Sequence, residues 1–182
     1  MRDVRAMSGA PAAVCVGVGA TLVMDASMVA ASRLAPAVLA TEKLDVNLIG
    51  RWVGGLGRGP RRGEDITGAP AVPGEVALGL ATHYLTGIAL TQVYFSSLER
   101  LGLEPGPVKA TAFGLVTGVL PLMVMFPSMG YGFWGRRSGD ARRMSSVMLL
   151  GHTAFGAGIG LWTLAYQTQG MNPRGAASRY SA

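Results

Sequence analysis

Residues 10–31 read APAAVCVGVGATLVMDASMVAA, an apolar stretch whose only charged side chain is Asp25. A helix needs about 20 such residues to cross the roughly 30 Å hydrocarbon core of a bilayer. Three further apolar stretches are long enough, at 75–98, 108–129 and 144–166, and Pro, Gly or charged residues bound each of them. The sequence therefore predicts an all-α fold, an integral membrane four-helix bundle forming one domain over residues 1–182.

The composition agrees with a membrane protein. Hydrophobic residues make up 49% of the chain and charged residues 14%, against about a quarter charged in soluble domains. The net charge of +6 would also suit a nucleic-acid-binding protein. The basic residues flank the apolar stretches, however, where they act as topology signals, so we expect membrane lipids and no nucleic acid as partners.

Arg2 and Arg5 precede the first apolar stretch, as basic residues precede a signal peptide. The stretch is longer than a signal core and carries Asp25. We therefore expect it to be retained as a transmembrane helix.

The connection over residues 32–74 is the longest loop, and it contains a predicted amphipathic helix at about 42–56. Leu44, Leu48, Trp52 and Leu56 recur there at every fourth position and form one apolar stripe. Such a helix either lies in the membrane interface, anchored by Trp52, or packs on the mouth of the bundle. Trp134, in the third connection, is a second expected interfacial anchor.

Lysine and arginine counts predict the orientation. The two long connections carry ten of them: Arg33, Lys43, Arg51, Arg58, Arg61, Arg62, Arg136, Arg137, Arg142 and Arg143. The opposite side carries six: Arg2, Arg5, Arg100, Lys109, Arg174 and Arg179. The excess favours both long connections in the cytoplasm and both termini outside.

Small residues recur at helical spacing in all four predicted spans. Such faces let helix backbones approach closely in lipid, where van der Waals packing replaces the hydrophobic effect. The glycines expected at helix contacts are Gly17, Gly79, Gly87, Gly114, Gly118, Gly156 and Gly160.

The two predicted hairpins also resemble each other. A shift of 101 positions places Gly17 on Gly118, and a shift of 69 places His83 on His152. Each hairpin has two spans, so both would have the same orientation, as in a parallel repeat about an axis along the membrane normal.

Three ionisable residues fall inside the predicted spans, all at a similar depth from the same side: Asp25, His83 and His152. An intramembrane carboxylate is costly and marks a functional site by default, with a histidine as its natural partner. Three interpretations stay open. The cluster relays protons or binds a cation, or it only satisfies hydrogen bonds in the bundle, or the two histidines ligate haem b. We expect no other cofactor and no metal site.

Pro121 and Pro127 fall inside the third span, and each removes a helical hydrogen bond, to Thr117 and Met123 respectively. The two prolines form either a hinge or a static kink covered by neighbouring helices.

Several segments in order along the chain carry a family resemblance. They are Gly19–Asp25 (GATLVMD), Gly50–Gly54 (GRWVG), Gly74-Glu75, His83-Tyr84, Gly87-Ile88, His152 and Phe155-Gly156. Together they resemble the bacterial membrane-protein family catalogued as domain of unknown function 2938. The resemblance implies a multi-spanning protein of the bacterial inner membrane and no particular reaction. Leu80 stands where that family usually has an aromatic residue.

The sequence leaves three classes of function open. The first is translocation or sensing of a proton, ion or small solute through Asp25, His83 and His152. The second is an accessory or structural subunit, in a homo-oligomer or a larger membrane complex. The third is a membrane-embedded lipid-modifying enzyme, which could use Asp25 or Glu75 with a histidine; catalysis is the least supported of the three.

Overall fold

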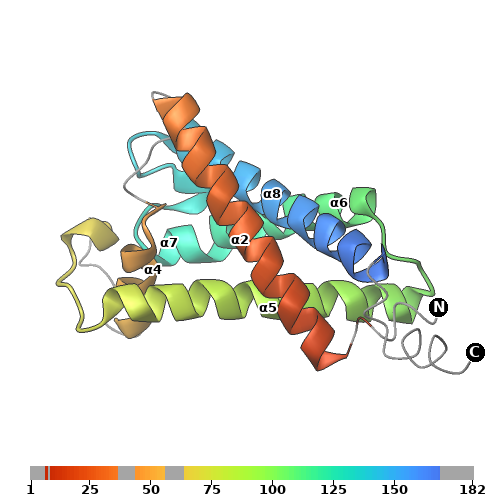
Figure 1. Ribbon diagram of the computed structural model, residues 1–182. Coiled ribbons are helices and arrows are strands. Elements are labelled where there is room, and N and C mark those ends of the chain that lie inside the picture. The colour runs from red at the N-terminus through yellow and green to blue at the C-terminus, as the bar shows by residue number, and fades with distance from the viewer. Residues whose placement is uncertain (1–6, 8, 37–43, 56–63, 169–182) are drawn as a thin grey trace, which may run out of the picture.

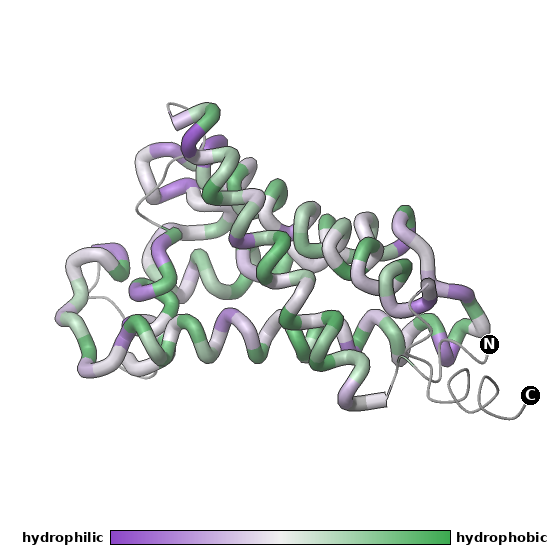
Figure 2. The backbone as a smooth tube through the Cα atoms, viewed as in Figure 1, coloured by the Kyte–Doolittle hydropathy of each residue, from purple (hydrophilic) through white to green (hydrophobic). Residues whose placement is uncertain are grey.

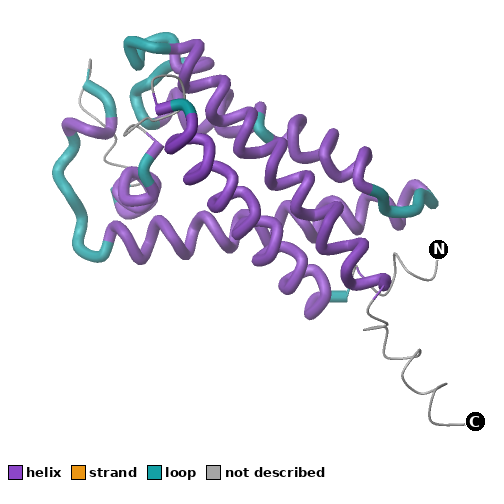
Figure 3. The backbone as a smooth tube through the Cα atoms, turned by 45° about the horizontal axis from the view of Figure 1, so that its top comes forward, coloured by secondary structure: helices purple, strands orange, loops and turns teal. Residues whose placement is uncertain are grey.

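The structure is a computed structural model, and it describes residues 7, 9–36, 44–55 and 64–168 (Figure 1). All the regular elements in these ranges are helical (Figure 3). The α-helices are α2 (Ala10–Leu34), α4 (Val46–Gly54), α5 (Glu75–Leu101), α6 (Pro107–Thr117), α7 (Phe126–Ser128) and α8 (Ala141–Thr168). Three short turns join them: the 3-10 turns η2 (Ile66–Gly68) and η4 (Phe133–Gly135), and the π-helical turn η3 (Pro121–Met125).

Four helical segments are long and apolar enough to cross a membrane: Pro11–Leu34, Glu75–Leu101, Pro107–Ser128 and Ala141–Thr168. The predicted all-α membrane fold with four spans is therefore confirmed, with helices that extend past several of the predicted ends. Glycines in the left-handed conformation set both ends of α5, Gly74 at φ 72° and Gly102 at φ 67°. Only a residue without a Cβ adopts that conformation at little cost, so the chain turns sharply there.

The spans pack in the spatial order α5, α2, α8, α6. α2 crosses α5 and also packs on α8, whose other side packs on α6 (Figure 1). α5 and α6 are consecutive in the chain and yet make few contacts. A first core lies between the spans and contains Val16, Ala20, Phe95, Phe155 and Ile159, all buried.

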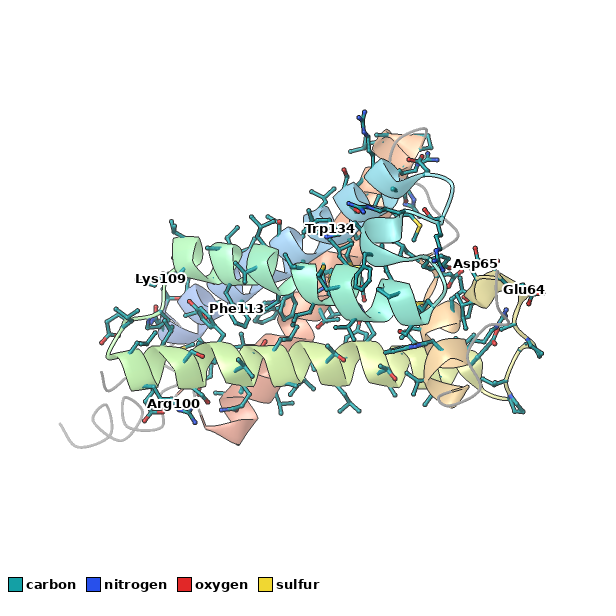
Figure 4. The ribbon with its side chains drawn as sticks, turned by 180° about the vertical axis from the view of Figure 1, so that it is seen from behind. Glu64, Asp65, Arg100, Lys109, Phe113 and Trp134 are labelled. Atoms are coloured by element: carbon teal, nitrogen blue, oxygen red, sulfur yellow. The ribbon has the colours of Figure 1, made fainter. Side chains whose placement is uncertain are left out.

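A second core lies at the end of the molecule where the two long connections meet. It joins α4 and η2 of the first connection to α7 and α8, through buried Leu48, Ile66, Phe126, Tyr131 and Met144. The backbone N–H of Ile66 donates to the carbonyl of Met129 at 2.8 Å, which ties the two connections together. Both basic connections thus lie on one side, as the sequence predicts. Figure 4 shows Asp65 and Trp134 at this end and Arg100 and Lys109 at the opposite end.

Large apolar side chains also cover the outside of the helices. Leu85 is 64% exposed, Val116 67% and Leu161 59%, although each lies well inside a span. Hydrophilic residues gather mainly toward the helix ends and in the connections (Figure 2). Such an apolar outer surface belongs in lipid rather than in water, so the chain is a membrane protein.

The helix of the first connection is shorter than predicted. α4 begins at Val46, because the Asp45 carboxylate caps it by accepting from the N–H of Asn47 at 3.4 Å. Of the predicted range 42–56, residues 42, 43 and 56 lie outside the described residues. The apolar side of α4 faces protein: Leu48 is buried, and Trp52 packs against the second core. Of the two placements expected from the sequence, the membrane interface or the mouth of the bundle, α4 therefore takes the second.

Candidate functional site

The face of α2 that carries Asp25 is built for close contact with α5. A Cβ on Gly17 would lie 2.7 Å from the Cα of Ile88, and a Cβ on Gly87 would lie 2.1 Å from the hydroxyl of Thr21. Both distances are far below a van der Waals contact, so only glycine permits this crossing. Thr21 turns its hydroxyl back onto the carbonyl of Gly17 at 2.8 Å, which satisfies it within α2. One turn further along α2, the same face presents Asp25 to α5.

Asp25 forms two hydrogen bonds with α5. Its Oδ1 lies 2.9 Å from Nε2 of His83, and its Oδ2 accepts from the hydroxyl of Tyr84 at 2.9 Å. The His83 and Tyr84 rings meet edge to face, with centroids 5.6 Å apart. Both carboxylate oxygens are therefore engaged, and the three side chains form what we call the Asp25 cluster: Asp25, His83 and Tyr84.

The Asp25 cluster is not sealed inside the protein. The Asp25 side chain is 41% exposed and that of His83 is 21% exposed. One proton lies between Asp25 and His83 whichever of them carries it: on Nε2 if the carboxylate is ionised, on Oδ1 if the acid is neutral. Two states that differ by a short proton jump are chemically suited to proton exchange.

His152 lies apart from this cluster, on α8. Its Nδ1 is 3.3 Å from the hydroxyl of Thr117, at the last residue of α6. Its ring also meets that of Phe155, with centroids 6.5 Å apart. The structure thus brings Asp25 and His83 into direct contact, whereas His152 contacts Thr117 and Phe155 within the second hairpin.

Sequence reasoning missed Tyr84 and Thr117 as members of these contacts. Neighbouring residues on a helix diverge by about 100°, so His83 and Tyr84 were not expected to meet one carboxylate. They do so because α2 crosses α5 at this point and Asp25 projects between them. The intramembrane dipeptide His83-Tyr84 was the available signal.

The remaining predicted glycines lie at close backbone contacts. A Cβ on Gly114 would lie 2.6 Å from the Cα of Gly156, and one on Gly160 would lie 2.9 Å from the Cα of Pro107. A Cβ on Gly118 would lie 3.0 Å from the Cβ of His152. Gly79 differs, because its neighbour is the carbonyl of Val46 in α4 and not another span.

The two hairpins pack in a register that differs from the predicted repeat. Gly87 contacts Thr21, whereas its counterpart Gly156 contacts Gly114. His83 likewise meets Asp25, whereas His152 meets Gly118. These contacts relate the first and third spans by a shift of 93 positions rather than 101, about two helical turns away. The predicted shift of 101 rested on sequence identities such as Gly17 with Gly118, whereas the close contacts between helices determine the packing register.

The prolines of the third span interrupt it. α6 ends at Thr117, four residues before Pro121, and the chain then forms the π-helical turn Pro121–Met125 before α7. Pro121 has no N–H to return to the carbonyl of Thr117, and a wider turn accommodates the loss. Pro127 lies within α7, where the hydroxyl of Ser128 donates to Val124 and Met125 carbonyls at 3.0 and 2.8 Å. Trp134, the second expected interfacial anchor, follows α7 in the turn η4. It is 37% exposed and has a positive φ of 57°.

A second polar centre lies at the mouth of the bundle. Arg51 of α4 holds Glu75 of α5 through two hydrogen bonds of 2.9 Å, and both side chains are 14% exposed. Arg51 also donates to the Ala69 carbonyl at 3.1 Å, while the N–H of Val72 donates to Glu75 at 3.2 Å. The hydrogen bonds with Glu75 raise the pKa of Arg51 above its usual value. This pair fastens the first connection to the start of α5.

Within the described residues, no group of three or more His, Cys, Asp or Glu side chains is arranged to hold a metal ion. The chain matches, over residues 14–167, the family described as protein of unknown function (DUF2938). No curated protein and no solved structure matches it. The match includes most or all of each of the four spans, with Asp25, His83 and His152. This chain therefore belongs to the DUF2938 family.

Proposed function

We propose that this protein binds protons at the Asp25 cluster and thereby translocates protons across, or senses them at, the bacterial inner membrane. The observation that carries the proposal is the Asp25 carboxylate itself, held at 2.9 Å by both His83 and Tyr84 well inside a membrane helix and still 41% exposed. All three side chains can gain or lose a proton, and a positioned network of this kind is what proton exchange requires.

The exposure argues against a purely structural role. A carboxylate that only joins two helices is best covered completely, because an exposed charge in lipid is expensive. A partly open carboxylate is stable at this depth where its open side meets water or other polar groups. Water at that side would also give protons a route to Asp25.

The position along the helices supports exchange with the cytoplasm. Asp25 lies nine residues before Leu34, and His83 lies eight residues after Glu75, or about 12–14 Å along each helix. Both helix ends adjoin the connections that carry ten of the sixteen basic residues, and the positive-inside rule assigns that side to the cytoplasm.

The test uses purified protein in liposomes that contain a pH-sensitive dye, after an imposed pH step. We expect the internal pH to change faster in liposomes that contain the wild-type protein than in empty liposomes. Asp25→Asn should abolish this acceleration. Asp140→Asn is the matched control: Asp140 accepts from the N–H of Arg143 at 3.1 Å outside the spans, a bond that asparagine also forms.

Sensing without transport is tested by infrared titration of the carboxyl band. Wild type should show a titrating band that Asp25→Asn removes and Asp140→Asn keeps. If neither flux nor band depends on Asp25, the proposal fails. A stable complex with defined membrane proteins would then favour the accessory-subunit class. The lipid-modifying class could use Glu75 as a catalytic carboxylate. That carboxylate is paired with Arg51 at the mouth of the bundle.

A further inference from the structure

We infer that the connection between the third and fourth spans binds an anionic phospholipid. Four exposed side chains form the surface, which we call the headgroup turn: Phe133, Trp134, Arg136 and Arg137. The two aromatic rings enter the boundary between acyl chains and headgroups, and the two guanidinium groups bind the phosphate. This surface is separate from the Asp25 cluster, and the inference does not depend on proton exchange there.

The headgroup turn lies where two spans leave the membrane. The third candidate span ends at Ser128 and the fourth begins at Ala141, so the connection between them emerges at the membrane surface. Tyr131 holds the base of this connection in the second core, where it is buried. Side chains that point away from that core at this level meet lipid headgroups.

Two aromatic rings face outward from this position. Phe133 is 54% exposed and Trp134 is 37% exposed. Rings of this size lose free energy when they stay in water, and the amphipathic indole is the side chain that membrane interfaces favour most. Lipid therefore covers these rings, because the protein itself does not.

The backbone holds Trp134 outward in an unusual conformation. Its φ of 57° lies in the left-handed region, which bulky side chains rarely adopt. The Trp134 carbonyl accepts from the hydroxyl of Ser145 in α8 at 3.0 Å, and the N–H of Arg137 donates to the Tyr131 carbonyl at 2.8 Å. Strained residues of this kind persist where neighbouring contacts fix them, and they gather at binding sites. The headgroup turn is thus a preformed surface.

The charge of this surface is complementary to an anionic headgroup. Residues 133–143 contain four arginines and one acidic residue, Asp140. The Asp140 carboxylate accepts from the N–H of Arg143 at 3.1 Å, at the start of α8. Arg136 and Arg137 are exposed, and within the described part of the chain neither side chain has a hydrogen bond or an ion pair. Both guanidinium groups are therefore available to a ligand.

The combination of rings and arginines selects a lipid over a free phosphate. A guanidinium binds a phosphate through two parallel hydrogen bonds. A free phosphate would use the arginines alone and leave both rings in water, whereas a phospholipid occupies both parts of the surface at once. Phosphatidylcholine also carries a phosphate, but its choline cancels the negative charge. An anionic lipid such as phosphatidylglycerol therefore binds better.

The test measures which lipid touches Trp134. The chain has three tryptophans, so Trp52→Phe combined with Trp162→Phe leaves Trp134 as the only indole emitter. Its fluorescence is recorded in mixed liposomes of phosphatidylcholine and phosphatidylglycerol, with bromine on the acyl chains of one lipid or the other, since bromine quenches on contact. We expect the quenching to give a binding constant about five-fold higher for phosphatidylglycerol, the effect of about one arginine near an anionic surface. Salt at about 1 M should weaken this preference.

Substitutions then assign the preference to its residues. Arg136→Gln combined with Arg137→Gln should bring the ratio of the two binding constants to about one. The corresponding double lysine variant should keep part of the preference, because the charge stays and the paired hydrogen bonds are lost. Arg100→Gln is the matched control: it removes an exposed arginine near the end of α5 and should leave the ratio unchanged. Thermal unfolding in detergent checks that each variant is folded.

Three results would overturn the inference. Equal quenching by the two lipids would mean that the turn contacts lipid without selecting a headgroup. No quenching by either lipid would mean that Trp134 faces water or another protein. A preference that survives in the folded double glutamine variant would remove the phosphate from Arg136 and Arg137. The first two results need only the variant that retains both arginines, so they decide the matter even if the glutamine variant does not fold.

Discussion

Gly114 and Gly156 lie backbone to backbone where α6 crosses α8. A Cβ on Gly114 would lie 2.6 Å from the Cα of Gly156, and a Cβ on Gly156 would lie 2.4 Å from the Ala110 carbonyl oxygen. Neither helix can withdraw without also moving His152, which lies one turn away from Gly156 on α8 and contacts Thr117 of α6. The packing of the second hairpin and the position of its histidine are therefore set by the same contact.

Gly156→Leu should destabilise the protein by about 1–3 kcal/mol or more, because overpacking forces the two backbones apart. Thermal unfolding in mild detergent measures this. Ala112→Leu adds a similar side chain to an exposed position of α6 and should leave the transition nearly unchanged. Equal effects of the two substitutions would mean that the crossing of α6 and α8 does not limit stability.

Gly79→Ala should release α4 from α5 without unfolding the spans. An alanine Cβ there would lie 1.9 Å from the carbonyl oxygen of Val46, and a Cβ on the facing Gly50 would lie 1.7 Å from that of Glu75. Limited proteolysis should then cut the first connection faster. Gly68→Ala is the control, because its Cβ would meet nothing closer than 3.8 Å. An unchanged cleavage rate for Gly79→Ala would contradict the docking of α4.

The sequence was sufficient to predict the four spans and the side on which their connections meet. Length and apolar content determine a membrane helix, and both can be read without knowing its neighbours. The interruption of the third span was predictable only in part. Pro121 requires a lost hydrogen bond at Thr117, but whether the chain kinks or widens into a π-helical turn depends on the packing of buried Leu122 and Phe126.

The contacts of the site were predictable where they depend only on the depth of a residue in the membrane and on the helix face that carries it. Asp25 and His83 lie at similar depths, and the small residues before Asp25 turn it toward a neighbouring helix, so their contact could be expected. The contacts of Tyr84 and Thr117 depend on crossing geometry, which no local pattern encodes. For the same reason Gly79 was assigned to a contact between spans, although it packs against α4.

Arg51→Lys should lower the thermal midpoint in detergent although the charge is kept. Lysine cannot form the two parallel bonds to Glu75 and the further bond to the Ala69 carbonyl. Arg100→Lys, at an exposed position near the end of α5, should leave the midpoint unchanged. If both variants behave alike, the ion pair contributes through charge alone and its geometry is unimportant.

Tyr131→Phe should reduce the loss of stability at alkaline pH. Burial, together with nearby Asp65, raises the pKa of Tyr131, so the folded protein keeps a neutral phenol while the unfolded chain ionises near its usual value of about 10. Tyr131 therefore contributes stability that is fully present below about pH 10 and is lost as pH rises further. Unfolding midpoints measured across this range should converge for wild type and variant above about pH 10. A constant difference would contradict the assignment.

Asp25→Leu and Asp25→Asn together distinguish a proton site from a structural contact. Leucine leaves the Tyr84 hydroxyl and Nε2 of His83 without their acceptor, at a cost of about 1–3 kcal/mol that partial exposure reduces toward the lower end. Asparagine keeps one acceptor oxygen and the shape of the side chain, so it should fold nearly as well as wild type. The decisive measurement is therefore made on Asp25→Asn, by infrared titration alongside thermal unfolding. A folded Asn variant that has lost the titrating band places the proton on Asp25, whereas a folded variant with an unchanged band means that Asp25 only joins α2 to α5. If Asp25→Leu is as stable as wild type, the contacts with His83 and Tyr84 contribute nothing to folding.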